Sequence, residues 1–174
     1  MQPDEKPKDF ADAGDADQGT NALVPRILGF DVGDRRIGLA ISDPLGYTAQ
    51  PLFTLHRTNR RADLKWLARV LRKHGVTEIV VGNPLYMSGD LSPQAEKAQA
   101  FAEAVRVEFG LPVHLWDERL TTREAHQILY EAGHARQEHR RVVDQVAATL
   151  ILQAFLEAGT KELGTRETRL DRQY

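Results

Sequence analysis

The order of the apolar segments predicts an α/β fold, in which one mixed sheet is covered by helices on both faces. Two short apolar runs come first, at residues 27–31 and 37–41, and the turn between them is short, polar and contains glycine, which favours an antiparallel hairpin. Later apolar runs of strand length alternate with amphipathic segments of helix length, which is typical of parallel strands connected by helices. The sequence therefore predicts a hairpin followed by alternating helices and strands.

The remaining elements follow from periodicity and from glycine and proline positions. A third strand is expected at residues 51–55, and Pro51 favours a place at the sheet edge because proline cannot donate to a ladder hydrogen bond. Two buried strands are expected at 78–82 and 113–116. Apolar stripes of helical spacing lie at 64–71, 98–109, 125–132 and 143–155, and a glycine at 75, 110, 133 or 159 follows each one as a predicted helix end. The run Thr121-Thr122-Arg123-Glu124 is a capping box for the third helix.

Composition indicates one globular domain at residues 23–159, with an acidic tail at 1–22 and a polar tail at 160–174. The 174 residues are 41% hydrophobic and 28% charged, which are values typical of globular proteins. The first 22 residues hold six acidic residues, two lysines and one aromatic residue, and we expect them to be disordered because they can bury little apolar surface.

Several classes of protein are excluded or disfavoured. No apolar run approaches the ~20 residues that a membrane span needs, and the sequence does not begin like a signal peptide. The absence of cysteine excludes disulfides, thiolate zinc sites and a thiol nucleophile. We therefore expect a cytoplasmic protein with no membrane partner.

The charge distribution bears on a nucleic-acid partner. The net charge is −2, and the acidic tail contributes −4 (six acids against two lysines), so the other residues carry +2. Because this value is small, any affinity for nucleic acid must come from a local basic patch.

Three acidic residues stand where secondary structure is expected to change. Asp31 ends the first strand, Glu118 follows the strand at 113–116, and Asp144 opens the last helix. Carboxylates from two strand ends and a helix can converge and bind a hard cation such as Mg²⁺ or Mn²⁺, which suits metal-assisted attack on a phosphodiester. Taken alone, each residue is better explained as a surface or capping acid, and Asp144 fits a first-turn acid favoured by the helix dipole equally well. The hypothesis rests on all three together.

Cationic and polar residues near the three acids are candidate substrate ligands. Guanidinium groups suit phosphate recognition, although the glutamates between them would also suit a salt-bridged surface. Tyr86 lies in the loop that follows the strand at 78–82, where its ring could stack on a base or pack against the protein. The candidate substrate-binding residues are Arg35, Arg36, Asn83, Tyr86, Arg119, Arg123, Arg140 and Arg141.

Several segments resemble the YqgF (RuvX-like) family in order and spacing, across roughly residues 26–158. They are residues 27–33 with 37–40, 79–84, 117–125 and 141–148, and the most specific is Asp117-Glu118-Arg119-Leu120-Thr121-Thr122. The resemblance implies a ribonuclease H-like fold, and it makes Asp31, Glu118 and Asp144 the metal-binding catalytic acids. The chain departs from the family pattern at Asn83, Tyr86 and Ser88, where Leu, Asn and Asp are expected, and these positions concern substrate handling rather than the acids.

The resemblance also implies a function. The family is described as Holliday-junction resolvases or as nucleases that process the 5′ end of pre-16S rRNA in ribosome biogenesis. We therefore expect a Mg²⁺- or Mn²⁺-dependent endonuclease acting on structured nucleic acid, with an rRNA precursor ahead of branched DNA. Resolution of Holliday junctions and a non-catalytic nucleic-acid-binding module of the same fold are the alternatives. An actin-like sugar kinase or ATPase, which shares the Asp-x-Gly motif, would need a second α/β domain that 174 residues do not accommodate. The sequence does not decide whether the substrate is RNA or DNA, whether the protein associates with the ribosome, or whether it is a monomer or a homodimer.

Overall fold

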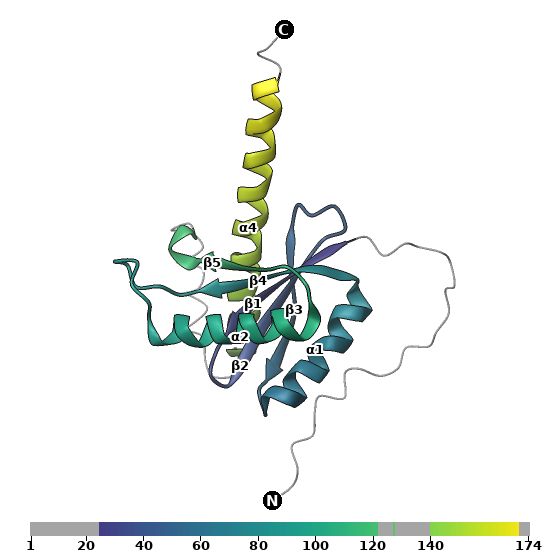
Figure 1. Ribbon diagram of the computed structural model, residues 1–174, viewed down its shortest axis with the longest axis vertical. Helices are drawn as coiled ribbons and strands as arrows, with labels where there is room; N and C mark the ends of the chain where they lie inside the picture. The colour runs from purple at the N-terminus through teal and green to yellow at the C-terminus, as the bar shows by residue number, and fades with distance from the viewer. Residues whose placement is uncertain (1–24, 122–126, 128–139, 171–174) are drawn as a thin grey trace, which may run out of the picture.

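The computed structural model describes residues 25–121, 127 and 140–170. Its strands are β1 (Arg26–Val32), β2 (Arg36–Ser42), β3 (Ala49–His56), β4 (Val76–Asn83) and β5 (Val113–Asp117), and its helices are α1 (Arg60–His74), α2 (Pro93–Phe109), the short 3₁₀ helix η1 (Glu118–Leu120) and α4 (Arg140–Leu170) (Figure 1). The predicted helix at 125–132 lies outside the described residues except for Gln127, and its capping box does so except for Thr121.

The five strands form one mixed sheet in the order β3-β2-β1-β4-β5. β1 pairs antiparallel with β2, and β2 with β3, whereas β1, β4 and β5 run parallel to one another. The predicted hairpin and parallel strands are therefore confirmed, and β3 lies at the edge as Pro51 predicts. Because β1, β4 and β5 are parallel, their carboxyl ends lie at the same edge of the sheet.

Helices cover both faces of the sheet, and each face has its own core. α1 and α2 pack on the face that holds the alternate β1 residues Leu28, Phe30 and Val32, all of which are buried. The long helix α4 covers the opposite face (Figure 1), and its buried residues Ala148, Ile151, Leu152 and Leu156 pack there against Ala40 and Val80. The alternation of side chains along a strand produces the two faces. Within the described residues, no helix is both long and apolar enough to cross a membrane.

Two helices end at the predicted glycines and one does not. Gly75 after α1 and Gly110 after α2 adopt left-handed conformations, with φ of 61° and 65°, which close the helices. The predicted end of the last helix at Gly159 is wrong, because α4 continues to Leu170 and Gly159 has no positive φ. A glycine lowers helix propensity by about 1 kcal/mol relative to alanine, but it ends a helix only where it adopts the left-handed conformation.

Candidate active site

Asp31 and Glu118 lie at the carboxyl edge of the parallel strands. Asp31 is the sixth residue of β1 and shares a sheet face with Gly29, on which α4 packs. Glu118 is the first residue of η1, directly after β5. The sheet therefore brings together two acids that are far apart in sequence.

Helix α4 brings Asp144 to the same edge. The described part of α4 starts at Arg140, so Asp144 lies beyond its first turn, and the alternative explanation as a first-turn acid is wrong. The helix packs closely on the sheet at the small residue Ala148, which is fully buried. A Cβ atom at Gly29 would lie 3.3 Å from the Ala148 carbonyl oxygen and 2.8 Å from Leu152 Cβ.

Two glycines on the strands beside Asp31 provide space for the other two acids. Gly38 of β2 pairs directly with Asp31, and the parallel register that pairs Phe30 with Val81 places Gly82 of β4 next to Asp31 on the other side. A Cβ atom at Gly38 would overlap the carbonyl oxygen of Asp144. A Cβ atom at Gly82 would lie 2.5 Å from Glu118 Oε1. Asp31 is thus central, with Asp144 over one flanking glycine and Glu118 over the other.

Burial and mutual repulsion raise the pKa values of two of these acids. Burial, and then the nearby negative charge of Asp144, together raise the pKa of Asp31 to about 6. The pKa of Glu118 is raised to about 7 by burial, then by the charge of Asp31 and then by that of Asp117. These couplings follow the geometry, because Asp31 lies between the other two.

The third acid has a cationic neighbour. Arg36 Nε lies 2.7 Å from Asp144 Oδ2, and the Asp144 side chain is 21% exposed. The sequence predicts that Arg36 lies near Asp31, whereas the structure pairs it with the acid on α4. Arg36 therefore balances part of the negative charge at this edge.

The acids supply oxygen ligands of the kind that Mg²⁺ and Mn²⁺ prefer. Among the residues that the structure describes, however, no three His, Cys, Asp or Glu side chains are arranged to hold a metal ion. The repulsion that raises the pKa values of Asp31 and Glu118 is one that a divalent cation would relieve. The three carboxylates are therefore chemically suitable ligands for such a cation. In this structure, Asp144 forms an ion pair with Arg36.

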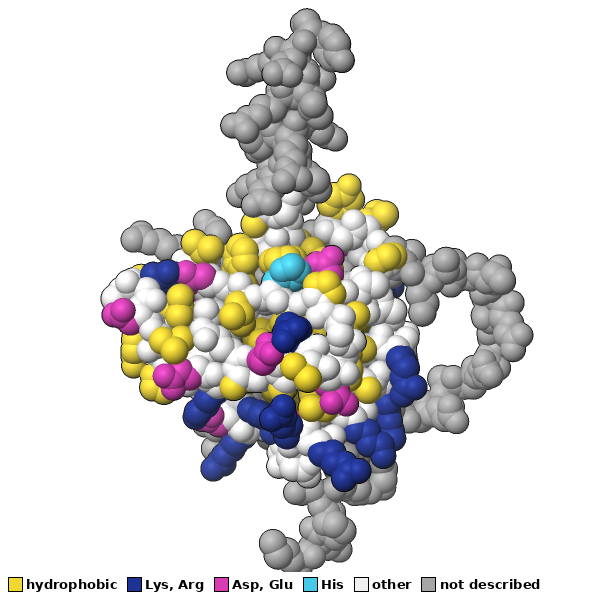
Figure 2. All heavy atoms as spheres, in the orientation of Figure 1, with side chains coloured by type: hydrophobic (Ala, Val, Ile, Leu, Met, Phe, Trp, Pro, Cys, Tyr) yellow, Lys and Arg dark blue, Asp and Glu magenta, His cyan; other side chains and the backbone are white. Residues whose placement is uncertain are grey.

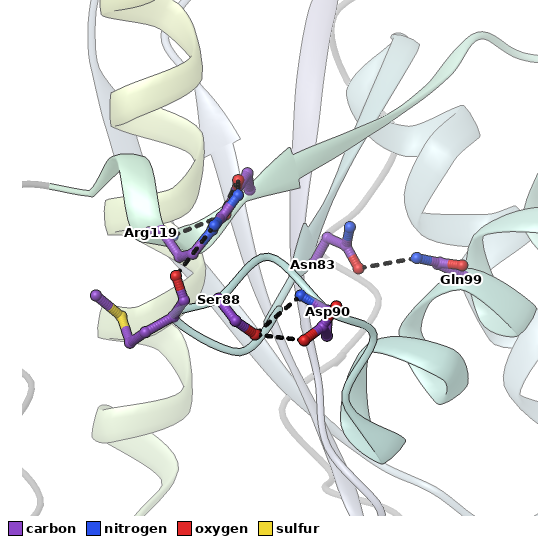
Figure 3. A network of polar contacts seen from close by, with 7 residues as sticks. Asn83, Ser88, Asp90, Gln99 and Arg119 are labelled. Carbon is purple, nitrogen blue, oxygen red and sulfur yellow. Dashed lines mark hydrogen bonds and ion pairs between the residues drawn. The ribbon is translucent and has the colours of Figure 1, made fainter.

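The loop between β4 and α2 borders this edge and is held by Arg119. The Arg119 guanidinium binds the Asp117 carboxylate, with Nη2 2.6 Å from Oδ2, and Nη1 donates to the Met87 carbonyl oxygen at 3.4 Å (Figure 3). Within the loop, Ser88 Oγ donates to Asp90 Oδ2 at 2.7 Å. Arg119 thus ties the loop to the end of β5.

The ordered loop presents two large side chains to solvent. Tyr86 is 54% exposed and Met87 is 88% exposed. The Gly89 amide donates to the Tyr86 carbonyl oxygen at 2.8 Å, and the Tyr86 amide donates to that of Asp90 at 3.0 Å, which closes the turn. The packing alternative for Tyr86 is therefore disfavoured, because more than half of the residue is exposed.

Sequence comparison identifies the family. A family profile described as "RuvX: Holliday junction resolvase" matches residues 25–158. The chain belongs to this family. The predicted membership is confirmed, and the sheet order and strand directions agree with the ribonuclease H-like fold that it implied.

Curated relatives match most of the chain. A protein of Moorella thermoacetica is 54% identical over 132 residues, which are 76% of this chain and 94% of that protein. A protein of Koribacter versatilis is 52% identical over 137 residues, or 79% and 90% of the two chains. Both are named "Putative pre-16S rRNA nuclease". Among solved structures, the chain is similar to Thermus thermophilus RuvC, with a TM-score of 0.49, 15% identity, and coverage of 78% of this chain and 96% of that one.

The other predicted substrate ligands of this RuvX-family chain differ in their position relative to the acids and in their exposure. Asn83 ends β4 on the face away from the acids, is 8% exposed, and accepts a hydrogen bond from Gln99 Nε2 at 3.2 Å (Figure 3). Arg35 is exposed in the β1–β2 turn. Arg140 and Arg141 begin the described part of α4, where their side chains are not described, and Arg123 lies outside the described residues.

Sequence reasoning missed the roles of Gly38 and Gly82 and the ion pair of Arg36. A signal for the glycines was present, because Gly38 interrupts an apolar strand segment and Gly82 ends one, and glycine in a strand often marks a close approach of another group. The partner of Arg36 carried no comparable signal, since it lies more than a hundred residues away in the sequence.

Substitution of the two flanking glycines should have different costs. Gly38→Ala places a methyl group against the backbone of α4, so we expect the free energy of unfolding to fall by about 3 kcal/mol or more. Gly82→Ala meets the ends of two side chains, Glu118 and Ile151, which can move, so we expect a loss of about 1 kcal/mol. Urea denaturation measures both. Equal costs would contradict the close approach of α4 at Gly38.

The raised pKa values predict a stability that falls with pH. The folded state retains the Asp31 and Glu118 protons to about pH 6 and 7, whereas the unfolded state releases them near pH 4, so the free energy of unfolding falls as pH rises through this window. One pKa unit corresponds to about 1.4 kcal/mol, so we expect a total fall of a few kcal/mol without divalent cations.

The matched control for this pH dependence is Glu118→Gln. His74, whose pKa is lowered mainly by burial, changes stability in the opposite direction near pH 6, and its contribution cancels in the difference between the two proteins. The free energy of unfolding of wild type minus that of Glu118→Gln should fall between pH 4.5 and 7.5, and Mg²⁺ should make this fall smaller. Parallel curves for the two proteins would contradict the raised pKa of Glu118.

Proposed function

We propose that this chain is a nuclease that hydrolyses phosphodiester bonds in structured nucleic acid, and that its substrate is an rRNA precursor cut near the 5′ end of pre-16S rRNA. The observation that carries the proposal is the convergence of Asp31, Glu118 and Asp144, from two strand ends and a helix, on one edge of the sheet. Placing three acids together lowers stability, and a cation-binding role explains their presence. The names of the relatives support the same reaction and substrate.

Mg²⁺ or Mn²⁺ would be held by the carboxylates of Asp31, Glu118 and Asp144. When bound, such a metal would lower the pKa of a water molecule and stabilise charge that develops on the phosphate. Without it, Arg36 holds Asp144 and compensates part of the negative charge. The same guanidinium would then be well placed to contact a substrate phosphate near the acids.

The proposed substrate contacts lie around this edge. The exposed ring of Tyr86 offers a surface for an unpaired base, and Arg35, Arg123, Arg140 and Arg141 are candidates for phosphate contacts. Arg119 has another role in this proposal, since Asp117 and the Met87 carbonyl engage it and it supports the loop that presents Tyr86. Asn83 is left out because it is buried on the opposite face.

A four-way DNA junction is the second candidate substrate. The description of the family profile favours it, because that description names a Holliday junction resolvase. Processing of an rRNA precursor would place the protein in the cytoplasm, in contact with assembling ribosomes. Incubation of the purified protein with labelled precursor RNA and with four-way junctions, with and without Mn²⁺, tests both substrates directly.

Removal of one acid charge at a time should abolish most of the cleavage. Asp31→Asn, Glu118→Gln and Asp144→Asn keep side-chain shape, so each should lower the single-turnover rate by on the order of 10²–10³-fold. Double variants should lose much less than the product of the single losses, since the acids act as one unit. Wild-type cleavage that persists in excess EDTA would contradict the metal-dependent mechanism.

Thermal stability separates this role from a structural one. Without divalent cations at pH 7.5, Asp31→Asn and Glu118→Gln should hold or raise Tm, because each removes a repelled charge. Asp144→Asn should not raise Tm, because it also removes the partner of Arg36. A structural role predicts lower Tm for the first two variants and unchanged cleavage.

The exposed tyrosine should contribute to binding of unpaired bases. Tyr86→Ala should weaken binding of RNA with an unpaired strand by about 5- to 100-fold, the range that corresponds to loss of one base stack. Fluorescence anisotropy in EDTA measures this without cleavage. Tyr47→Ala is the matched control, because Tyr47 is also exposed but lies in the β2–β3 turn. An equal effect of both substitutions would contradict a specific contact at Tyr86.

A further inference from the structure

A cationic cleft lies between α1 and α2, on the sheet face opposite the acids. Its volume is about 370 Å³. Three cations line it, from the residue after β3, the start of α1 and the N-terminal part of α2, together with one acid and an apolar surface; these residues are Arg57, Arg60, Lys97, Asp63, Leu64 and Phe101. None of the three cations belongs to the site described above.

Arg57 makes contacts on several sides of its guanidinium inside this cleft. Its Nη1 donates to the Gly33 carbonyl oxygen at 2.9 Å, and its guanidinium carbon lies 5.8 Å from the centroid of the Phe101 ring. Its Nε lies 3.8 Å from Oδ2 of Asp63, a buried acid that also accepts a hydrogen bond from the Thr58 amide. A guanidinium fixed at this many points is already ordered for binding an anion, and only some of its five N–H donors are engaged.

The other cations make the cleft and its margin positive. Arg60 and Lys97 are exposed, and Lys97 Nζ lies 2.7 Å from Asp34 Oδ1. Arg35 adjoins them, because its carbonyl oxygen accepts a hydrogen bond from the Arg57 amide at 2.9 Å. These four cations face two acids, Asp34 and Asp63, which leaves a local charge of +2. Lys and Arg side chains gather in the lower part of the surface in Figure 2, around this end of the helices.

The hairpin turn connects the cleft to the acids. Gly33, whose carbonyl oxygen binds Arg57, is two residues after Asp31. At the neighbouring residue, Gln94 of α2 donates through Nε2 to the Val32 carbonyl oxygen at 2.5 Å. A chain of phosphates that leaves the acids over this turn would therefore meet Arg35 and then the cleft.

We propose that this cleft binds the phosphodiester backbone of the substrate strand beside the cleavage site. The inference rests on the proposed nuclease function and adds a second binding site to it. Cations contributed by separate elements along a path suit successive phosphates better than a single small anion, and Leu64 and Phe101 provide apolar contact for sugars. This patch supplies the local positive charge that a chain of net charge −2 needs to bind nucleic acid.

The test is the salt dependence of binding by the variant Arg60→Gln/Lys97→Gln. Arg57 is left intact because its contacts support the hairpin turn. Anisotropy of a labelled precursor RNA in EDTA, over a salt series, should show affinity about 10-fold weaker at low salt. The slope of log K against log salt should be smaller by about 1.4–1.8, as expected for two lost phosphate contacts.

The matched control is Arg69→Gln/Arg72→Gln, which removes the same number of positive charges from α1, outside the cleft. Residues 60 and 72 are 12 positions apart, or about 18 Å along a helix. The control should retain the wild-type slope. RNA shortened so that it ends at the catalytic edge should bind wild type and the cleft variant equally. An unchanged slope for the cleft variant, or the same loss in the control, would overturn the proposal.

The outcomes also separate this inference from the nuclease proposal. The nuclease proposal fails if wild type cleaves neither RNA nor junction with Mn²⁺. If the cleft variant nevertheless shows the smaller slope of log K against log salt, the proposal that the cleft binds nucleic acid is retained. If wild type cleaves and the cleft variant binds and cleaves equally well, the cleft alone is refuted. Binding of inorganic phosphate or a mononucleotide in the cleft, with no change in RNA affinity between the proteins, would likewise refute it.

Discussion

The close packing of helix α4 on the sheet is the constraint on which the candidate site depends. The helix can approach only where the strands carry no side chain, at Gly29 and Gly38, and where its own side chains are small, as at Ala148. This approach brings the backbone of Asp144 over β2 while Asp31 lies on the next strand. Packing that looks purely structural therefore determines the distance between two acids, and the same geometry at Gly82 makes room for the third.

The acids of the candidate site lower the stability of the folded protein. Burial of carboxylates beside one another disfavours their charged forms, and the raised pKa values of Asp31 and Glu118 express that cost. The Arg36–Asp144 ion pair offsets part of it. Two separate cores, one under α1 and α2 and one under α4, supply the apolar burial that holds the acids in place. A site of this kind is expected where function rather than stability determines the residues.

The sequence predicted the architecture well because its signals are local. Apolar runs, the short hairpin turn and the glycines at 75 and 110 each predict the structure of the residues next to them. The parallel strands then imply that Asp31 and Glu118 lie at the same edge of the sheet. Prediction was weaker where the answer depends on contacts between distant segments. Nothing near Arg36 indicates its pairing with Asp144, and nothing near Gly159 shows that α4 continues to Leu170. The orientation of the Asn83 side chain could have been predicted. Successive side chains of a strand point to opposite faces, so Asn83 points to the face opposite that of Gly82.

The central claim is that the three acids form one electrostatic unit, and carboxyl ¹³C NMR titration tests it most directly. Without divalent cations, we predict that Asp31 titrates at about pH 6 and Glu118 at about pH 7. Asp144→Asn should lower the pKa of Asp31, and Mg²⁺ should lower both values by favouring the charged forms. Titration of both residues near their ordinary values of 3.8 and 4.5, unchanged by Mg²⁺ and by Asp144→Asn, would contradict the account.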